Sequence, residues 1–185
     1  AQRLNIVYDE TEQKFSIRFM GHPYEVHFPE FEIKALDEEE KDGLLMTSLP
    51  AKTFILRYLL EGQYVQSSGK FMTFREVPTY GELYIQPFTG RCIKRLTYGF
   101  GFKLKAFAEG MEKIPGVKKI SMGDVAYEFE LIDGYRMRFI FWAGDEEFPP
   151  SAQILYSDNF QFGFHAEDMV VAGDLSITTL KRLCA

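Results

Sequence analysis

The sequence of 185 residues predicts an α+β fold, in which a largely antiparallel, curved sheet packs against a long central helix and C-terminal helices. Segments with the alternating pattern of strands outnumber helical segments and lack the strand–helix–strand rhythm of a parallel sheet. Aromatic residues make up 16% of the chain, and Phe and Tyr favour half-buried pleated surfaces. Neither an internal repeat nor a linker-like stretch divides the chain, so we expect a single domain over residues 1–185.

Three strands are expected near the start of the chain. Apolar residues alternate with polar ones over residues 4–8 and 15–19, on either side of a polar turn at 9–13, which predicts a hairpin. Residues 24–28 continue as a third strand. An acidic connector follows over residues 35–43, and its run of like charge predicts a solvated loop or turn of helix.

Two helices are expected in the middle of the chain. Ser48 is the predicted N-cap of the first, which has Pro50 in its first turn and ends at Gly62. The second covers residues 91–111, where the apolar side chains fall within about 40° of one direction at about 100° per residue. Two glycines lie on its flanks, where they allow either a close neighbour or a bend.

Residues 125–142 predict a β-hairpin with an Asp-Gly pair at its tip. A two-residue turn at that pair would set Phe129 opposite Arg138 and mix apolar with charged side chains on both faces. An odd-length loop instead sets Phe129 opposite Phe139 or Met137, which gives one apolar face and one charge-paired face. We therefore expect an odd-length loop.

The C-terminal part is expected to close the sheet and then become helical. Short strands are predicted near residues 152–156 and 160–164, where apolar residues alternate with polar ones. Helical segments follow over 166–183, with a break at the Gly-Asp pair 173–174. These segments complete the antiparallel sheet and the helices that we expect to pack on it.

Composition excludes several classes of protein. The 27 acidic residues outnumber the 21 basic ones, and a net charge of −6 argues against a protein that coats DNA. The two cysteines, Cys92 and Cys184, cannot by themselves hold a four-cysteine zinc site or an iron–sulfur cluster. No apolar run approaches the roughly 18 residues of a membrane span, and no signal peptide is recognised. We therefore expect no membrane partner and a soluble, cytoplasmic protein.

The acidic turn, residues 142–150, is the most unusual string in the chain. It places three carboxylates in a row before two prolines, and rigid clustered carboxylates suit hard cations or supply a general acid. Later acidic residues could join them in space. The candidate ligand-binding residues are Trp142, Asp145, Glu146, Glu147, Asp158, Glu167 and Asp168. The alternative is structural: Asp145 closes the turn through backbone hydrogen bonds while Glu146 points to water.

The basic stripe, within residues 91–119, is a second candidate site. This segment holds eight Lys or Arg residues and two Glu, a local charge of +6. The candidate anion- or RNA-binding residues on the outer side of the expected helix are Arg91, Lys94, Arg95, Tyr98, Phe102 and Lys105. Such a mixture suits phosphate contact combined with base stacking. The alternative is a solvated helix face, with Tyr98 and Phe102 packed against the acidic connector.

The histidines give little indication of chemistry. His22 and His27 are five residues apart on an expected strand, so they face opposite sides and cannot jointly bind a metal without a bend. His165 precedes an acidic helix start and is expected at the beginning of that helix. A nucleophile elbow, a phosphate loop and a dinucleotide fingerprint are all missing from the sequence.

The segment from Trp142 to Ala152 reads W-x-G-D-E-E-F-P-x-S-A, and a hydrophobic strand, Asp158 and the acidic pair 167–168 follow it. In this pattern the chain resembles an uncharacterised bacterial and archaeal domain-of-unknown-function family that is common in anaerobes. The resemblance covers most of the chain, most closely over residues 139–170. It implies an association with a four-cysteine iron–sulfur segment, and some members are labelled as iron–sulfur proteins connected with tRNA. Because this chain lacks the four cysteines, a cluster would require a missing segment or a cysteine-rich partner.

Three functions follow as hypotheses, and they leave open whether the protein is an enzyme. The first is a non-enzymatic accessory or ligand-binding domain beside an iron–sulfur or redox partner, with the acidic turn shaping the site and Trp142 lining it. The second is an RNA- or nucleotide-binding protein that uses the basic stripe. The third is a hydrolase that uses a divalent cation held by Asp145, Glu147 and nearby acids.

Overall fold

The computed structural model describes residues 1–78 and 81–185. Over these residues nine strands form one sheet with the order β4-β3-β2-β7-β8-β9-β5, while β1 lies beside β2 and β6 beside β7. All of the strand pairs are antiparallel. The predicted α+β class with an antiparallel sheet is confirmed.

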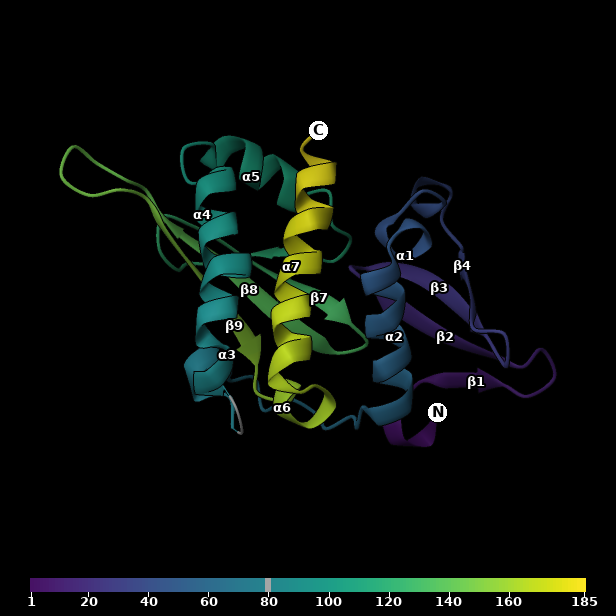
Figure 1. Cartoon of the computed structure of the whole chain (residues 1–185). Coiled ribbons are helices and arrows are strands. Elements are labelled where there is room, and N and C mark those ends of the chain that lie inside the picture. The colour runs from purple at the N-terminus through teal and green to yellow at the C-terminus, as the bar shows by residue number, and fades with distance from the viewer. Residues whose placement is uncertain (79–80) are drawn as a thin grey trace.

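The first four strands form a meander, shown in purple in Figure 1. They are β1 (Val7–Asp9), β2 (Lys14–Phe19), β3 (His22–His27) and β4 (Glu32–Ala35). The predicted hairpin is confirmed, because Tyr8 lies opposite Phe15. The first strand begins later than expected, however, because Gln2–Leu4 forms a 3₁₀-helix that ends at Asn5 in the left-handed conformation.

The acidic connector and the first long helix follow the meander. The connector contains a 3₁₀-helix, η2 (Glu38–Glu40), and leads into α1 (Leu44–Thr47) and α2 (Leu49–Glu61). The predicted cap of α2 is confirmed, because Ser48 Oγ accepts a hydrogen bond from the backbone N–H of Ala51 at 3.4 Å. The expectation of a solvated connector is wrong at Glu40, which is buried.

The expected helix over residues 91–111 is broken at residues 101–103, so its predicted bounds are wrong, whereas a long helical run covers residues 81–100 without a break. After α2 the chain forms β5 (Phe71–Thr73) and η3 (Phe74–Glu76). The helical run then consists of α3 (Gly81–Phe88), a π-helix (Thr89–Lys94) and α4 (Arg95–Phe100), and α5 (Leu104–Met111) follows it. At the break, a Cβ on Gly101 would lie 2.9 Å from Pro150 Cγ, and Lys103 leaves the helical conformation with φ −137° and ψ 44°. The chain therefore turns a corner, and α5 crosses the end of α4 (Figure 1).

The hairpin of β7 (Val125–Ile132) and β8 (Tyr135–Trp142) combines a short turn with a bulge. Its tip is the two-residue Asp-Gly turn, with φ 33° and 87°, so the expected odd-length loop is wrong. A bulge between Glu130 and Ile132 then shifts the register. As a result Phe129 lies opposite Met137, which is one of the two predicted registers.

The C-terminal part differs from expectation in two places. Strand β9 (Ser151–Ser157) is confirmed, but Phe160–Gly163 forms the helix α6 instead of a strand. Both Phe160 and Phe164 are buried, whereas Phe162 is 49% exposed, and this is helical spacing rather than alternation. The helix α7 (Ala166–Leu183) is continuous, without the expected break, because Gly173 packs closely on Cys92.

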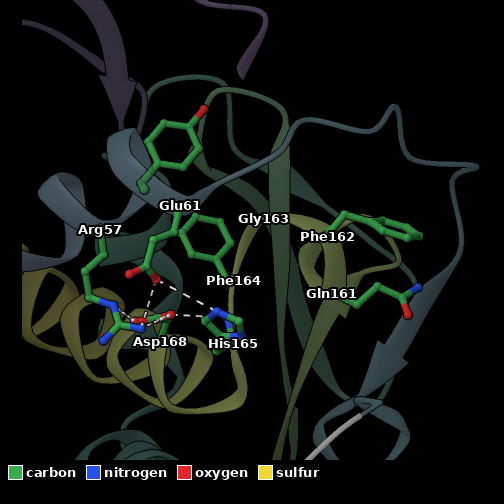
Figure 2. A pocket seen from close by; sticks show the side chains of 9 residues that line it. Arg57, Glu61, Gln161, Phe162, Gly163, Phe164, His165 and Asp168 are labelled. Carbon is green, nitrogen blue, oxygen red and sulfur yellow. Dashed lines mark hydrogen bonds and ion pairs between the residues drawn. The ribbon is translucent and has the colours of Figure 1, made fainter. Parts of the chain in front are cut away.

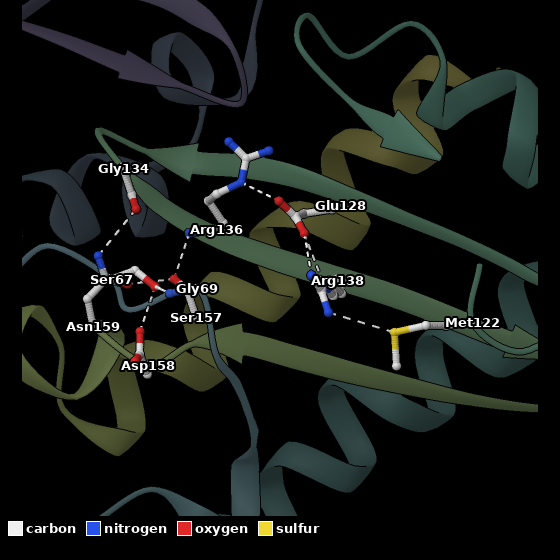
Figure 3. Close-up of polar contacts among 10 residues, drawn as sticks. All are labelled: Ser67, Gly69, Met122, Glu128, Gly134, Arg136, Arg138, Ser157, Asp158 and Asn159. Atoms are coloured by element: carbon white, nitrogen blue, oxygen red, sulfur yellow. Dashed lines mark hydrogen bonds and ion pairs between the residues drawn. The ribbon is translucent and has the colours of Figure 1, made fainter. Parts of the chain in front are cut away.

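Helices α3, α4 and α7 lie over one face of the sheet (Figure 1). The core between them is rich in aromatic side chains, including Phe107, Phe129, Phe139, Phe141 and Tyr156. On the opposite face of the β7–β8 hairpin, Glu128 forms ion pairs with Arg136 and Arg138 at 2.6 and 2.7 Å (Figure 3). The short strand β6 (Lys118–Lys119) pairs with β7. Within the described part of the chain, no helix has the length and apolar character needed to cross a membrane.

Candidate functional site

A buried histidine begins β3 and faces the acidic connector. Alternate residues of β3 are buried, and the pattern places His22 on the same side as Tyr24 and Val26. Only 7% of His22 is exposed. Because β3 and β4 are antiparallel neighbours, the connector that follows β4 returns to the start of β3.

The connector places two carboxylates against this imidazole. His22 Nδ1 lies 2.8 Å from Asp37 Oδ2 and 3.9 Å from Glu39 Oε1. One ligand atom from each of the three residues falls within 4.8 Å of the others. No other group of three His, Cys, Asp or Glu side chains meets this spacing among residues 1–78 and 81–185. We call His22, Asp37 and Glu39 the acidic–histidine cluster.

Glu40 lies beside the cluster, on the Nε2 side of His22. The hydroxyl of Tyr24 donates a hydrogen bond to Glu40 Oε2 at 2.7 Å, and Arg182 forms an ion pair with Glu40 Oε1. His22 Nε2 lies 4.0 Å from the same Oε1 atom. Burial and the neighbouring Glu40 raise the pKa of Tyr24 well above its ordinary value, so its hydroxyl remains a donor. The buried carboxylate of Glu40 is thus held between the strand β3 and the last turn of α7.

A cavity of about 520 Å³ opens beside the cluster. Its lining includes His22 and the carboxylates of Glu39, Glu40 and Asp42. The lining also includes the cationic side chains of Lys113 and Arg182. Lys113 Nζ also contacts the backbone carbonyl of Leu183. The cavity therefore offers charged groups of both signs beside a buried imidazole.

The donor set suits a divalent transition metal. One imidazole nitrogen and two carboxylate oxygens are ligands that Zn²⁺, Mn²⁺ and Fe²⁺ accept. At metal–ligand distances of about 2.1 Å, neighbouring ligands in tetrahedral or octahedral geometry lie roughly 3.0–3.5 Å apart. The separations from Nδ1 of 2.8 and 3.9 Å lie on either side of this range, and both His22 and Glu39 line the cavity.

Sequence reasoning missed this site because it tested the histidines against each other. The two do face opposite sides of β3 as predicted, and His27 instead lies 3.5 Å from Glu25. The signal that could have found the site is the hairpin itself. An acidic run that follows the second strand of a hairpin returns to the residue that begins the first strand.

The acidic turn has the hydrogen bonds that the structural alternative predicts. Asp145 Oδ1 accepts hydrogen bonds from the backbone N–H groups of Glu147 and Phe148, at 2.9 and 2.7 Å. The bond from Phe148, with a smaller contribution from that of Glu147, holds the pKa of Asp145 below its ordinary value. Glu146 and Glu147 are exposed, and Trp142, at the end of β8, is 43% exposed. The turn is therefore closed by its own carboxylate.

Asp158 lies at the opposite end of β9 from the acidic turn. Ser67 Oγ donates a hydrogen bond to Asp158 Oδ1 at 2.6 Å (Figure 3). The N–H of Ser68 donates another to the same oxygen at 3.1 Å. Partial burial alone would raise the pKa of Asp158, but the bonds from the two serines lower it. Asp158 thus anchors the loop before β5 and does not join the acidic turn.

Glu167 and Asp168 belong to the first turn of α7, as Figure 2 shows for Asp168. Asp168 Oδ2 accepts a hydrogen bond from the backbone N–H of His165 at 3.1 Å, and Oδ1 lies 2.9 Å from Arg57 Nε. Burial raises the pKa of Asp168 despite these partners. The hydroxyl of Tyr84 donates to Glu167 at 3.4 Å. The prediction that His165 begins a helix is confirmed, and the seven candidate ligand residues are spread over three places.

The basic stripe is partly neutralised. Arg91 Nη2 lies 3.2 Å from Asp174 Oδ2, and Arg95 pairs with the other oxygen of the same carboxylate. The other four predicted residues are exposed: Lys94, Tyr98, Phe102 and Lys105. Tyr98 and Phe102 are 76% and 82% exposed, so the alternative that they pack against the acidic connector is wrong.

Comparison with known proteins yields a single family. No curated protein and no solved structure matches the chain. A family model described as "Domain of unknown function (DUF3786)" matches residues 1–179, which include the acidic–histidine cluster and the acidic turn. The chain therefore belongs to this family of domains of unknown function, DUF3786.

Proposed function

We propose that this chain is a non-enzymatic ligand-binding domain, which holds a divalent cation with the acidic–histidine cluster and binds a small anion in the adjoining cavity. One observation carries the proposal. The buried His22 aims a ring nitrogen at two carboxylates, at the edge of a cavity that also exposes Arg182 and Lys113. Histidine is the commonest metal ligand in proteins, and here its imidazole is buried instead of facing water.

Charge explains why a cation and an anion would bind together. Asp37 and Glu39 have no lysine or arginine within 4 Å among the described residues. A divalent cation would neutralise both carboxylates, and the cavity wall would then favour an anion. That anion would take the open positions of the metal and pair with Arg182 and Lys113.

Glu40 would position the imidazole. Metal-bound histidines commonly direct their second ring nitrogen at a carboxylate, which fixes the ring orientation. Here Glu40 lies on the Nε2 side of His22, and Tyr24 and Arg182 hold it in place. A proton and a metal ion compete for Nδ1, so binding of the cation should weaken as the pH falls.

The test is thermal unfolding with Zn²⁺, Mn²⁺, Mg²⁺ and Ca²⁺, each at increasing concentration. An ion at 100 times its Kd should stabilise the fold by about 2.7 kcal/mol, which raises the Tm by roughly 5–10 °C in a protein of this size. We expect this shift with Zn²⁺ or Mn²⁺. It should disappear in Asp37→Asn and in His22→Gln.

Two control variants keep the test specific. His27→Gln removes the histidine on the opposite side of the same strand, and Asp145→Asn with Glu147→Gln alters the acidic turn; both should keep the full response. Absence of a shift in the wild type, or an equal shift in Asp37→Asn, would overturn the proposal. Inorganic phosphate, titrated with and without the metal, then tests the anion, whose binding should require the metal and weaken in Lys113→Gln.

The iron–sulfur association remains a separate part of the proposal, in which a partner protein would hold the cluster. Cys92 is fully buried, its Sγ lies 3.3 Å from the Val170 carbonyl, and burial raises its pKa to about 12. Cys184 is partly buried and burial also raises its pKa. These thiols favour their neutral form, so we assign any cluster to a cysteine-rich partner.

A further inference from the structure

A second surface of the molecule combines exposed aromatic rings with lysines. It consists of Tyr98 on α4, Phe102 at the corner between α4 and α5, and four exposed lysines around them: Lys94, Lys103, Lys105 and Lys181. We call this the lysine–aromatic face. Lys181 crosses over from α7, and its Cε would lie 3.2 Å from a Cβ placed on Gly99, between the two aromatic residues in sequence.

We propose that the lysine–aromatic face binds single-stranded nucleic acid, stacking bases on Tyr98 and Phe102 and pairing phosphates with the lysines. The rings are 76% and 82% exposed, and large aromatic side chains left this open lose the stabilisation of burial. Base stacking would restore it without requiring a particular sequence. Two rings four residues apart offer a platform for a short run of bases.

The lysines are free for phosphate contact. Lys94, Lys103 and Lys181 have no acidic partner within 4 Å among residues 1–78 and 81–185. Lys105 has only Glu109, at 3.8 Å, and both side chains are largely exposed. Charge complementarity therefore selects a polyanion, and the two rings select one whose bases are unpaired.

The surroundings also set the path of the strand. Pro150, at the base of the acidic turn, lies against Gly101, so carboxylates border the face on that side. These carboxylates would repel phosphates, so the nucleic-acid strand would run along α4 toward Lys94. Arg91 lies further along the same path, but its pairing with Asp174 leaves it less charge to offer. This assigns the main phosphate contacts to lysines and not to the arginines of the basic stripe.

The test is fluorescence anisotropy with a labelled eight-nucleotide oligouridine, and with oligothymidine, a duplex and polyglutamate as further probes. We expect saturable binding of the single strands, with a log–log salt slope of about −2 to −3 for three or four phosphates. Tyr98→Ala and Phe102→Ala should each weaken binding by about tenfold or more. Lys94→Gln with Lys103→Gln should weaken binding and make the slope shallower.

Controls use features of the same surface. Phe148→Ala removes another exposed aromatic residue, on the acidic turn, and Arg91→Gln removes an arginine that is already paired; both should bind nearly as the wild type does. Because all substituted side chains are exposed, an unchanged Tm should accompany each variant. Equal binding of the duplex, binding insensitive to both aromatic substitutions, or preference for polyglutamate would overturn the proposal, and the last would point to a protein partner. A chelator should leave this binding unchanged, which separates it from the metal proposal.

Discussion

The Tyr24 hydroxyl donates a 2.7 Å hydrogen bond to Oε2 of Glu40, and this buried contact ties the strand β3 to the acidic connector. The bond gives a buried carboxylate a neutral partner, while Arg182 supplies the charged one. A charge buried with two partners is costly to leave with one. The pair therefore decides how firmly Glu40 can hold the imidazole of His22.

Tyr24→Phe should lower both stability and metal affinity. Loss of the bond leaves Glu40 without one of its donors, which should lower the free energy of unfolding by about 1–2 kcal/mol in urea denaturation. A Glu40 that is free to rotate should also weaken the binding of Zn²⁺ by about tenfold or more.

Tyr127→Phe is the matched control for this effect. It removes a hydrogen bond of the same length, 2.7 Å, from Tyr127 to Glu112, away from the cluster. We expect a smaller loss of stability, because Glu112 is exposed and water can replace the lost donor, and no loss of metal affinity. If the two variants bound Zn²⁺ equally, Glu40 would have no positioning role.

Asp133→Asn should stabilise the protein at neutral pH. Burial raises the pKa of Asp133 from 3.8 to about 6, although the backbone N–H of Arg18 donates to its Oδ1 at 3.0 Å. The charged form is therefore disfavoured in the fold, and this cost grows as the pH rises from about 4 to about 6. Asn keeps the acceptor, removes the charge and suits the positive φ of 33°.

Chemical denaturation at several pH values checks this prediction. At pH 7 the variant should exceed the wild type in free energy of unfolding by about 1–3 kcal/mol, and the difference should close near pH 4. A variant that was less stable than the wild type at pH 7 would show that the carboxylate has a charged partner in solution.

Gly173→Ala should destabilise the contact between α7 and the π-helix. A Cβ at this position would lie 2.9 Å from Cys92 Sγ, so overpacking should cost about 1–3 kcal/mol even though alanine favours a helix. In a Cys92→Ala background the cost should shrink, because the sulfur is gone. Gly90→Ala, with no atom within 4 Å of its Cβ, is the control and should be neutral or stabilising in thermal unfolding.

Asp145→Ala should lower the Tm modestly without changing the response to metal ions. The carboxylate accepts two backbone N–H groups, and alanine leaves both without an intramolecular partner. Asp145→Asn keeps one acceptor oxygen and should lower the Tm by less than Asp145→Ala does. Loss of the Zn²⁺ response in Asp145→Ala would show that the metal binds at the acidic turn and not at the acidic–histidine cluster.

Local signals in the sequence were reliable where the structure depends on neighbours along the chain. The cap at Ser48 follows from local backbone chemistry. The helix α2 also ends at Gly62 as predicted, although Gly62 has φ −61° and not the left-handed conformation of a C′ glycine. The pattern around Phe162 failed because three phenylalanines at every second position satisfy alternation, while the first and third also satisfy helical spacing. A short segment cannot distinguish the two periods.

Features that depend on distant residues were not predictable. The corner at Gly101 depends on Pro150, and the continuity of α7 at Gly173 depends on Cys92. The candidate metal site needs a pairing of strands before His22 meets Asp37, fifteen residues away in the sequence. Composition patterns describe each segment by itself, whereas these contacts arise only when the segments pack together.

The bulge at Leu131 places a seam in the sheet. Along the strand order, β2 joins β7 through one residue pair, Phe19 and Ile132, beside a 2.8 Å bond from the N–H of Met20 to the Leu131 carbonyl. The acidic–histidine cluster lies on the meander side of this seam, whereas Arg182 reaches Glu40 from α7 on the other side. The ion pair between Glu40 and Arg182 therefore crosses the seam, whereas a cation held by the acidic–histidine cluster would join only segments on the meander side. Losing the ion pair would loosen the smaller half of the sheet first.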